Sequence, residues 1–290
     1  MASLKEVKGR IATVNNTRKI TSAMKMVASA KLHKAQGAIT NMLPYERRLH
    51  GLLTNLLGGS EVLVWNTPRE VKRVALVVFS SNSSLCGGFN ANVIKHATQW
   101  LSEYQALGKD NILLYPVGKK VADALSKMGY AVQGNFQHLA DKPSFAEAAE
   151  LAQGLMNLFT QGEVDRVELL YNHFKSTASQ ILTREVYLPF LLSSPEQSEE
   201  SRVHPQESDY ILEPSREELL ETLLPKVLRM KLYTVLLDSN ASEHAARTMA
   251  MQIATDNADD LLQELTLMYN KTRQQAITNE LLDIVGGSMA

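Results

Sequence analysis

The two ends of this chain carry the same unusual pattern, and it limits the possible folds more than any motif does. At both ends, side chains suited to a buried seam recur at intervals of three and four residues, which is the spacing of one stripe along a helix. At the start of the chain the seam consists of Leu4, Val7, Ile11 and Val14. Near its end the seam consists of Ala246, Met249, Ile253, Asn257, Leu261, Leu265, Met268, Thr272, Ala276 and Asn279.

Both seams run through stretches with few helix breakers. Between Gly9 and Gly37 there is neither Gly nor Pro, and over 215–285 the only such residue is Pro225. A periodic pattern much longer than about 25 residues indicates a coiled coil. We therefore expect long helices over 4–41 and 215–285.

The first helix is expected to kink and then continue. Pro44 removes a backbone donor, so we expect a kink there before a second helical stretch that reaches Leu57 and ends at Gly58 and Gly59. Neither terminal seam can be buried by its own helix. The sequence therefore predicts that the two terminal helices pack on each other.

Charge is distributed unevenly, although the net charge of the chain is only −1. The first helix is basic and carries Glu6 as its only acid among the following cations: Lys5, Lys8, Arg10, Arg18, Lys19, Lys25, Lys31 and Lys34. The last fifty residues or so are predominantly acidic. Such blocks indicate that the two ends attract one another or bind different partners. Nucleic acid is not expected as a partner, because residues 1–43 contain no aromatic side chain for base stacking.

The middle of the chain has the alternating strand and helix pattern of an α/β domain. Short β-branched runs typical of buried strands alternate with amphipathic helical segments, which predicts a mainly parallel sheet with helices on both faces. We expect strands at 71–80, 111–117, 130–133, 165–173 and 180–189, the last two forming a hairpin, and helices at 90–104, 119–128 and 145–159. The predicted division is a helix over 1–58, an α/β domain over 70–192, a polar linker over 193–209 and a C-terminal helix over 210–290.

No motif predicts chemistry carried out by this chain. The loop from Phe79 to Asn90 follows a strand and contains glycines, but it matches neither the dinucleotide-binding nor the P-loop spacing, so a structural turn is the favoured interpretation. Cys86 is the only cysteine, which excludes an internal disulfide. It is expected to be a small buried hydrophobe, with a reactive thiol as the alternative. The seven histidines are scattered. We therefore expect no catalytic residue, no cofactor and no metal site.

Several motifs, in order along the whole chain, resemble the gamma subunit family of F-type ATP synthases. The two most specific are Ile20-Thr21-Ser22-Ala23-Met24-Lys25-Met26-Val27-Ala28 and Leu267-Met268-Tyr269-Asn270-Lys271-Thr272-Arg273-Gln274. Shorter matches are Leu85-Cys86-Gly87-Gly88-Phe89-Asn90, the range 210–214, Ser242-Glu243-His244-Ala245-Ala246-Arg247, and 277–281. One departure is the turn Asn82-Ser83-Ser84, where many members have Asp-Arg-Gly.

The resemblance implies an antiparallel coiled coil of the N- and C-terminal helices with an inserted Rossmann-like domain. It also implies a noncatalytic central-stalk rotor that couples rotation of a membrane ring to a catalytic hexamer of alpha and beta subunits, with the epsilon subunit as a further partner. Positions matching the family's hexamer-coupling residues are Met24, Lys25, Arg247, Arg273, Gln274, Thr278 and Glu280. Positions matching the foot that meets the ring and the epsilon subunit are Tyr210 and Glu213.

Two other functions stay open at this point. One is a small-molecule-binding α/β enzyme that uses the terminal helices for oligomerisation, and the other is a coiled-coil scaffold without motor function. No apolar run approaches the roughly 18 residues of a membrane span, so the resemblance implies a peripheral protein on the cytoplasmic face of a bacterial inner membrane.

Overall fold

The computed structural model describes residues 3–56, 65, 69–190, 212–213 and 215–288. The chain divides into two compact units, one formed by Met1–Ala30 with Arg247–Ala290 and the other by Lys31–Ala246. Two long helices, α1 (Leu4–Leu56) and α6 (Arg216–Ser288), each contribute to both units. The linker predicted over 193–209 lies outside the described residues, and the four-part division drawn from the sequence stays a prediction.

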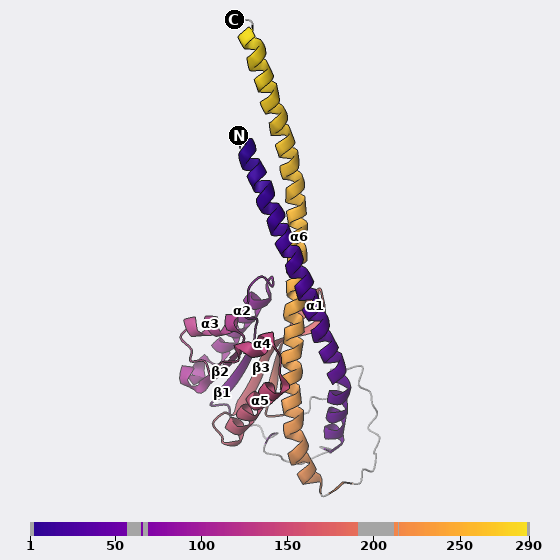
Figure 1. The fold of residues 1–290 in the computed structure, drawn as a ribbon. Helices are drawn as coiled ribbons and strands as arrows, with labels where there is room; N and C mark the ends of the chain where they lie inside the picture. Colours follow the sequence, from indigo (N-terminus) through magenta and orange to yellow (C-terminus); the bar gives the residue numbers. More distant parts are fainter. Residues whose placement is uncertain (1–2, 57–64, 66–68, 191–211, 214, 289–290) are drawn as a thin grey trace. The chain divides into compact units, whose positions relative to one another are not determined.

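The first unit is an antiparallel pair of helices, made by the start of α1 and the end of α6 (Figure 1). Arg18 Nη1 donates to Asp259 Oδ1 at 2.8 Å, and the hydroxyls of Thr21 and Thr255 lie 2.8 Å apart. Moving forward along α1 therefore means moving backward along α6, which confirms the predicted antiparallel arrangement. The expected α1 seam is confirmed as well, because Val7 is buried and its seam neighbours are half-buried.

The expected α6 seam is wrong in its register over most of its length, and Leu265 is its one buried member. Large members of that seam, such as Met249, Ile253 and Met268, are more than a third exposed. The buried side chains are Met251, Ala258 and Leu265, at intervals of seven residues. The buried stripe includes a small residue, while bulkier apolar side chains lie outside it. Choosing the seam by side-chain size and hydrophobicity therefore predicted the wrong face of the helix for most of its members.

Both long helices pass through a proline. The structure has α1 as one helix of 53 residues that contains Pro44 and runs to Leu56. The predicted end at Leu57 lies outside the described residues. Helix α6 has 73 residues and contains Pro225 as its tenth residue, past the first turn, so the proline removes one backbone hydrogen bond within the helix. The Ser215 hydroxyl accepts a hydrogen bond from the Glu218 backbone N–H, as expected of an N-cap residue.

The second unit contains a four-stranded sheet in the order β2-β1-β3-β4. Strand β1 (Val74–Phe79) pairs in parallel with β2 (Ile112–Val117) and β3 (Arg166–Ser176), and β3 pairs antiparallel with β4 (Ser179–Leu188). The last two strands form the predicted hairpin. The predicted mainly parallel sheet is confirmed.

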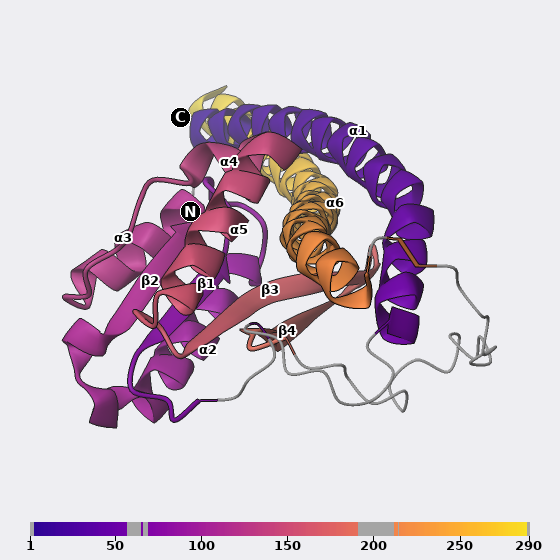
Figure 2. The ribbon, with the colours of Figure 1, turned by 90° about the horizontal axis from the view of Figure 1, so that it is seen from below.

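Helices cover both faces of this sheet (Figure 2). Helices α2 (Phe89–Glu103) and α3 (Lys119–Lys127) pack on one face, where β1 contributes Val74, Leu76 and Val78. Helices α4 (Gln137–Asp141) and α5 (Phe145–Thr160) lie on the other face together with the first part of α6. Two short 3₁₀ turns, Gln105–Leu107 and Lys109–Asn111, connect α2 to β2.

Two local expectations are corrected by the structure. The strand predicted over 130–133 is reduced to a single bridge between Val132 and Leu114, because Gly129 and Gly134, both with positive φ, leave only four residues between two turns. Helix α4 was not predicted. Its five residues are too few to show a helical period.

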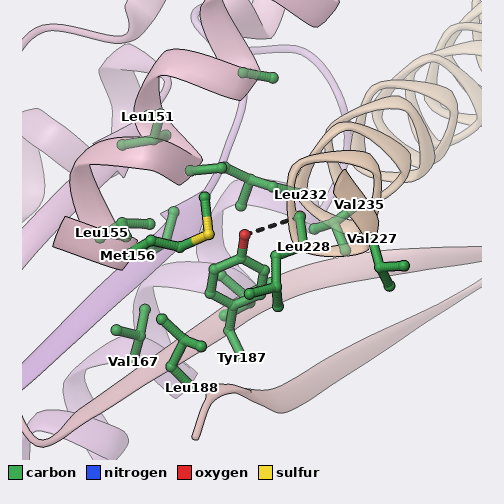
Figure 3. Close-up of a cluster of buried hydrophobic side chains, with 14 of the residues drawn as sticks. Leu151, Leu155, Met156, Val167, Tyr187, Leu188, Val227, Leu228, Leu232 and Val235 are labelled. Carbon is green, nitrogen blue, oxygen red and sulfur yellow. Dashed lines mark hydrogen bonds between the residues drawn. The ribbon is translucent and has the colours of Figure 1, made fainter. Parts of the chain in front are cut away.

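The larger core joins α5 and α6 across the sheet face that α5 covers. Leu155, Met156 and Phe159 of α5 are fully buried against it, and each buried side chain of this size contributes about 1.5–3 kcal/mol to folding. Tyr187 of β4 lies between α5 and α6, and its hydroxyl donates to the Leu228 carbonyl at 2.8 Å (Figure 3). This core fixes α6 on the α/β domain.

Tyr187→Phe tests how strongly this buried hydroxyl stabilises the core. Burial raises the pKa of Tyr187 above its ordinary value, so above about pH 10 the unfolded chain releases this proton while the folded chain keeps it. At neutral pH we expect the variant to lose about 1 kcal/mol of unfolding free energy, because one hydrogen bond is gone. Above about pH 10 the parent should lose stability more steeply than the variant, by about 1.4 kcal/mol per pH unit.

Urea unfolding at pH 7 and at several values between 9 and 11 measures both effects. Tyr45→Phe is the control, because Tyr45 is half-exposed and its loss should change neither the stability nor its slope. Equal alkaline slopes for the parent and Tyr187→Phe would contradict the assignment.

Candidate functional site

The helical pair of the first unit exposes many large apolar side chains. They occur on both helices and extend along the end of α6: Ile20, Met26, Val27, Met249, Ile253, Leu261, Leu267, Met268, Ile277, Leu281, Leu282, Ile284 and Val285. Leu267, for example, is 71% exposed. Extended apolar surface of this kind marks a site of protein interaction.

The last part of α6 continues beyond the start of α1. The register set by the Arg18–Asp259 and Thr21–Thr255 pairs brings the first turn of α1 opposite the turn that contains Thr272. After Thr272, every described side chain of α6 is exposed. Helices in proteins owe most of their stability to packing of one face, so this unpacked end of α6 is a surface that a partner would stabilise.

Four of the predicted coupling residues lie on this exposed end of α6. They are Arg273, Gln274, Thr278 and Glu280. The Thr278 hydroxyl donates to the Gln274 carbonyl at 2.9 Å, so these two residues follow each other on one face of the helix. The exposed guanidinium, amide and carboxylate groups are available to hydrogen-bond with a partner.

The other predicted residues have different surroundings. Met24 and Lys25 are half-buried on α1. Arg247 is only 8% exposed and interacts with other groups of the protein, so its environment differs from that of Arg273. Glu213 is exposed, and Tyr210 lies outside the described residues.

A polar segment of α6 docks on the α/β domain, and sequence reasoning did not identify its role. Asp238 accepts hydrogen bonds from the Phe174 backbone N–H at 2.7 Å and from His173. The next turn adds two hydrogen bonds to backbone carbonyls, from Asn240 and Ser242. The available signal was a run of small and polar residues, 238–245, directly after Leu236 and Leu237 in a segment expected to be helical.

The loop after β1 is closed by its own polar groups. Asn90 Nδ2 donates to the Ser81 hydroxyl at 2.8 Å and to Cys86 Sγ at 3.1 Å, and Cys86 is buried as expected. Leu85 has a φ of 67°, which side chains other than glycine rarely adopt. The structure supports the interpretation of this loop as a structural turn.

Asn82 connects the same loop to two helices. Its side-chain amide donates to the Asp141 carboxylate and to the Gln137 carbonyl, both at 2.7 Å. Its side-chain oxygen accepts from the Lys119 backbone N–H at 2.9 Å. The turn at Asn82 therefore connects the end of β1 to α4 and α3 through hydrogen bonds of one neutral side chain.

Comparisons with known proteins agree with the resemblance drawn from the motifs. A family model described as ATP synthase matches residues 3–290. A curated ATP synthase gamma chain of Phocaeicola vulgatus is 69% identical over 292 residues and covers 100% of both chains. That of a Bacteroides fragilis strain is 64% identical over 294 residues, again with 100% coverage of both. This chain belongs to the ATP synthase gamma chain family.

Solved structures with the same fold come from mitochondrial ATP synthases. A chain of the Euglena gracilis enzyme, in a structure titled OSCP/F1/c-ring, has a TM-score of 0.66 at 21% identity and covers 99% of this chain and 93% of its own length. A second chain, in a structure titled rotor, has a TM-score of 0.62 at 20% identity, with 94% and 98% coverage. At these identities the likeness shows the fold. The alternative of a small-molecule enzyme is not favoured by these comparisons.

Among the residues that the structure describes, no group of three or more His, Cys, Asp or Glu side chains is placed to hold a metal ion. None of the helices described here is both long and apolar enough to span a bilayer.

The contrast between Arg247 and Arg273 gives a prediction about stability. Arg247→Ala removes a buried cation from its interactions, and we expect a loss of about 1–3 kcal/mol because buried partner groups are left unsatisfied. Arg273→Ala removes an exposed side chain and should change stability by less than about 0.5 kcal/mol. Urea unfolding of the purified chain, followed by circular dichroism, measures both. Equal losses for the two variants would contradict this distinction.

Proposed function

We propose that this chain is the central-stalk rotor subunit of a bacterial F-type ATP synthase. In this proposal the helical pair turns inside a hexamer of alternating alpha and beta subunits, while the α/β domain lies outside the hexamer with the epsilon subunit and the membrane ring. The proposal rests on membership of the gamma chain family and on the surface of the helical pair.

The exposed end of α6 is the observation that carries the proposal. Its apolar side chains include Ile277, Leu281 and Ile284, and no described residue of α1 reaches far enough to cover them in the observed register. Leaving this much apolar surface in water is unfavourable, at about 25 cal/mol per Å². A surrounding ring of partner subunits would bury it.

The helical pair would act on the catalytic subunits by shifting their conformational populations. A shaft changes such an equilibrium only through contacts that differ between the two states, and moving one site from 1:99 to 99:1 requires about 5.5 kcal/mol. Exposed ion pairs contribute about 0–1 kcal/mol each. The uneven shape of the pair, in which α6 continues beyond α1, therefore carries most of the coupling, and the charged groups adjust it.

The chain itself is proposed to be noncatalytic, with nucleotide bound by the hexamer. Met24 and Lys25 of α1 would face a beta subunit, and Arg273 and Gln274 of α6 would face an acidic loop of the hexamer. Arg247, Thr278 and Glu280 would support the same coupling. Tyr210 and Glu213 would belong to the foot that meets the ring and the epsilon subunit. The complex would place this chain peripherally at the cytoplasmic face of the inner membrane.

Arg273→Ala and Gln274→Ala test the coupling role directly. Each variant is assembled with the alpha and beta subunits, and ATP-driven rotation is followed by single-molecule microscopy together with ATP hydrolysis. We expect assembly to be normal and rotational torque to fall, because each change removes hydrogen-bond donors presented to the hexamer without changing a buried group of this chain.

Gln275→Ala is the matched control. Gln275 is exposed beside the two test positions on the same helix, but it is not one of the assigned residues, so its loss should leave torque unchanged. Unaltered rotation in both test variants would reject their assignment. A chain that does not assemble with the hexamer at all would reject the proposed function.

A further inference from the structure

The second unit contains a groove that is lined by none of the residues assigned to the rotor function. The face of β2 that packs under α2 and α3 is well buried, whereas Leu113 and Tyr115 on its other face are only half-buried. Helices α4 and α5 lie on this second face (Figure 2). Between them and β2 is a groove of about 590 Å³.

The floor and walls of the groove are apolar and aromatic. Leu151 and Leu155 of α5 contribute buried side chains to it. Tyr115 and Phe136 also line it, with ring centroids 6.4 Å apart and planes inclined at 39°. The groove volume is within the range of about 300–1,000 Å³ that binding sites usually occupy.

A glycine keeps one side of the groove open. Gly154 lies inside α5 and lines the groove, and a Cβ atom built on it would meet no atom within 4 Å. Neither packing nor backbone conformation therefore requires glycine here, although glycine destabilises a helix interior relative to alanine. The missing side chain leaves space for an occupant.

The charges that line the groove favour a cation. Glu147 and Glu150 of α5 contribute carboxylates, His138 is hydrogen-bonded to Glu147, and none of the lining residues is Lys or Arg. Burial, followed by the nearby charge of Glu163, raises the pKa of the Tyr115 phenol. An occupant with a positive group on an apolar body is complementary to such a site.

We propose that this groove binds a segment of a partner protein that carries an arginine between apolar residues. A guanidinium can stack on Tyr115 or Phe136 and donate paired hydrogen bonds to Glu147 and Glu150. The neighbouring apolar residues would cover Leu151 and Leu155. The groove is open to solvent along one side, which suits a chain segment. The proposal is independent of the rotor function, because it uses no residue of the helical pair.

Fluorescence anisotropy with the purified full chain tests the proposal. The probe is a fluorescein-labelled peptide, LLRLL. The comparison peptide is the same except that citrulline, a neutral isostere, replaces arginine. We expect micromolar binding of the arginine peptide and about tenfold weaker binding of the citrulline peptide, because only the first is charge-assisted.

Variants of the groove distinguish the contribution of charge to peptide binding from the contribution of shape. Glu147→Gln combined with Glu150→Gln should weaken the arginine peptide about tenfold and leave the citrulline peptide unchanged. Gly154→Leu should abolish binding of both peptides by filling the groove, whereas Gly154→Ala should weaken it much less. Asp123→Asn combined with Glu221→Gln removes the same charge from exposed sites elsewhere and should have no effect.

Several results would overturn the proposal. They are no binding by the parent chain, equal binding of the two peptides, or unchanged binding in the Glu147→Gln and Glu150→Gln double variant. Benzamidine binding as tightly as the peptide would also overturn it, because the site would then serve free small cations. If Gly154→Leu lowers the melting temperature, the double variant decides the question, because its substitutions are on the groove surface and preserve side-chain size.

Discussion

A seam of side chains at intervals of three and four is the constraint on which the first unit depends. Within the first unit the two helices have only each other to pack against, so burial of their facing sides stabilises both. The seam includes polar members, and the Thr21–Thr255 hydroxyl pair lies within it. Each hydroxyl also bonds a carbonyl of its own helix, but the contact between the two hydroxyls forms in only one alignment. It therefore favours that register, as polar seam residues do in other coiled coils. That register determines how much of α6 is left uncovered.

In the second unit, α6 is held by two kinds of interaction. Apolar side chains from Leu220 to Leu236 pack into the core with α5. One turn later, Asp238, Asn240 and Ser242 bind backbone groups of the α/β domain through hydrogen bonds. Hydrogen bonds to backbone groups require a defined direction and distance between donor and acceptor, which apolar packing does not. The combination fixes the rotation of the helix as well as its position on the domain.

The sequence predicted the elements that have strong periodicity or full burial, and it failed where neither was present. Strand β1 is buried at all six residues and was recognised from its β-branched run, whereas the bridge at Val132 and helix α4 are too short to show a period. Before Leu265 the α6 seam was placed on the wrong face, since Ala258 is a weaker hydrophobic signal than Ile253. The motifs identified Arg273 and Gln274, and the structure adds that they are exposed, but the acidic groove beside Gly154 depends on tertiary packing that no motif records.

The antiparallel register of α1 and α6 in the first unit determines which part of α6 is exposed to a partner, and a disulfide scan tests that register most directly. The single native cysteine is replaced by Cys86→Ser, and Thr21→Cys is then paired with Thr255→Cys or, as an offset control, with Leu262→Cys. Because the two threonine hydroxyls lie 2.8 Å apart, mild oxidation should form an intramolecular disulfide in the first pair and not in the second. No disulfide in the first pair, or equally rapid formation in both, would contradict the account.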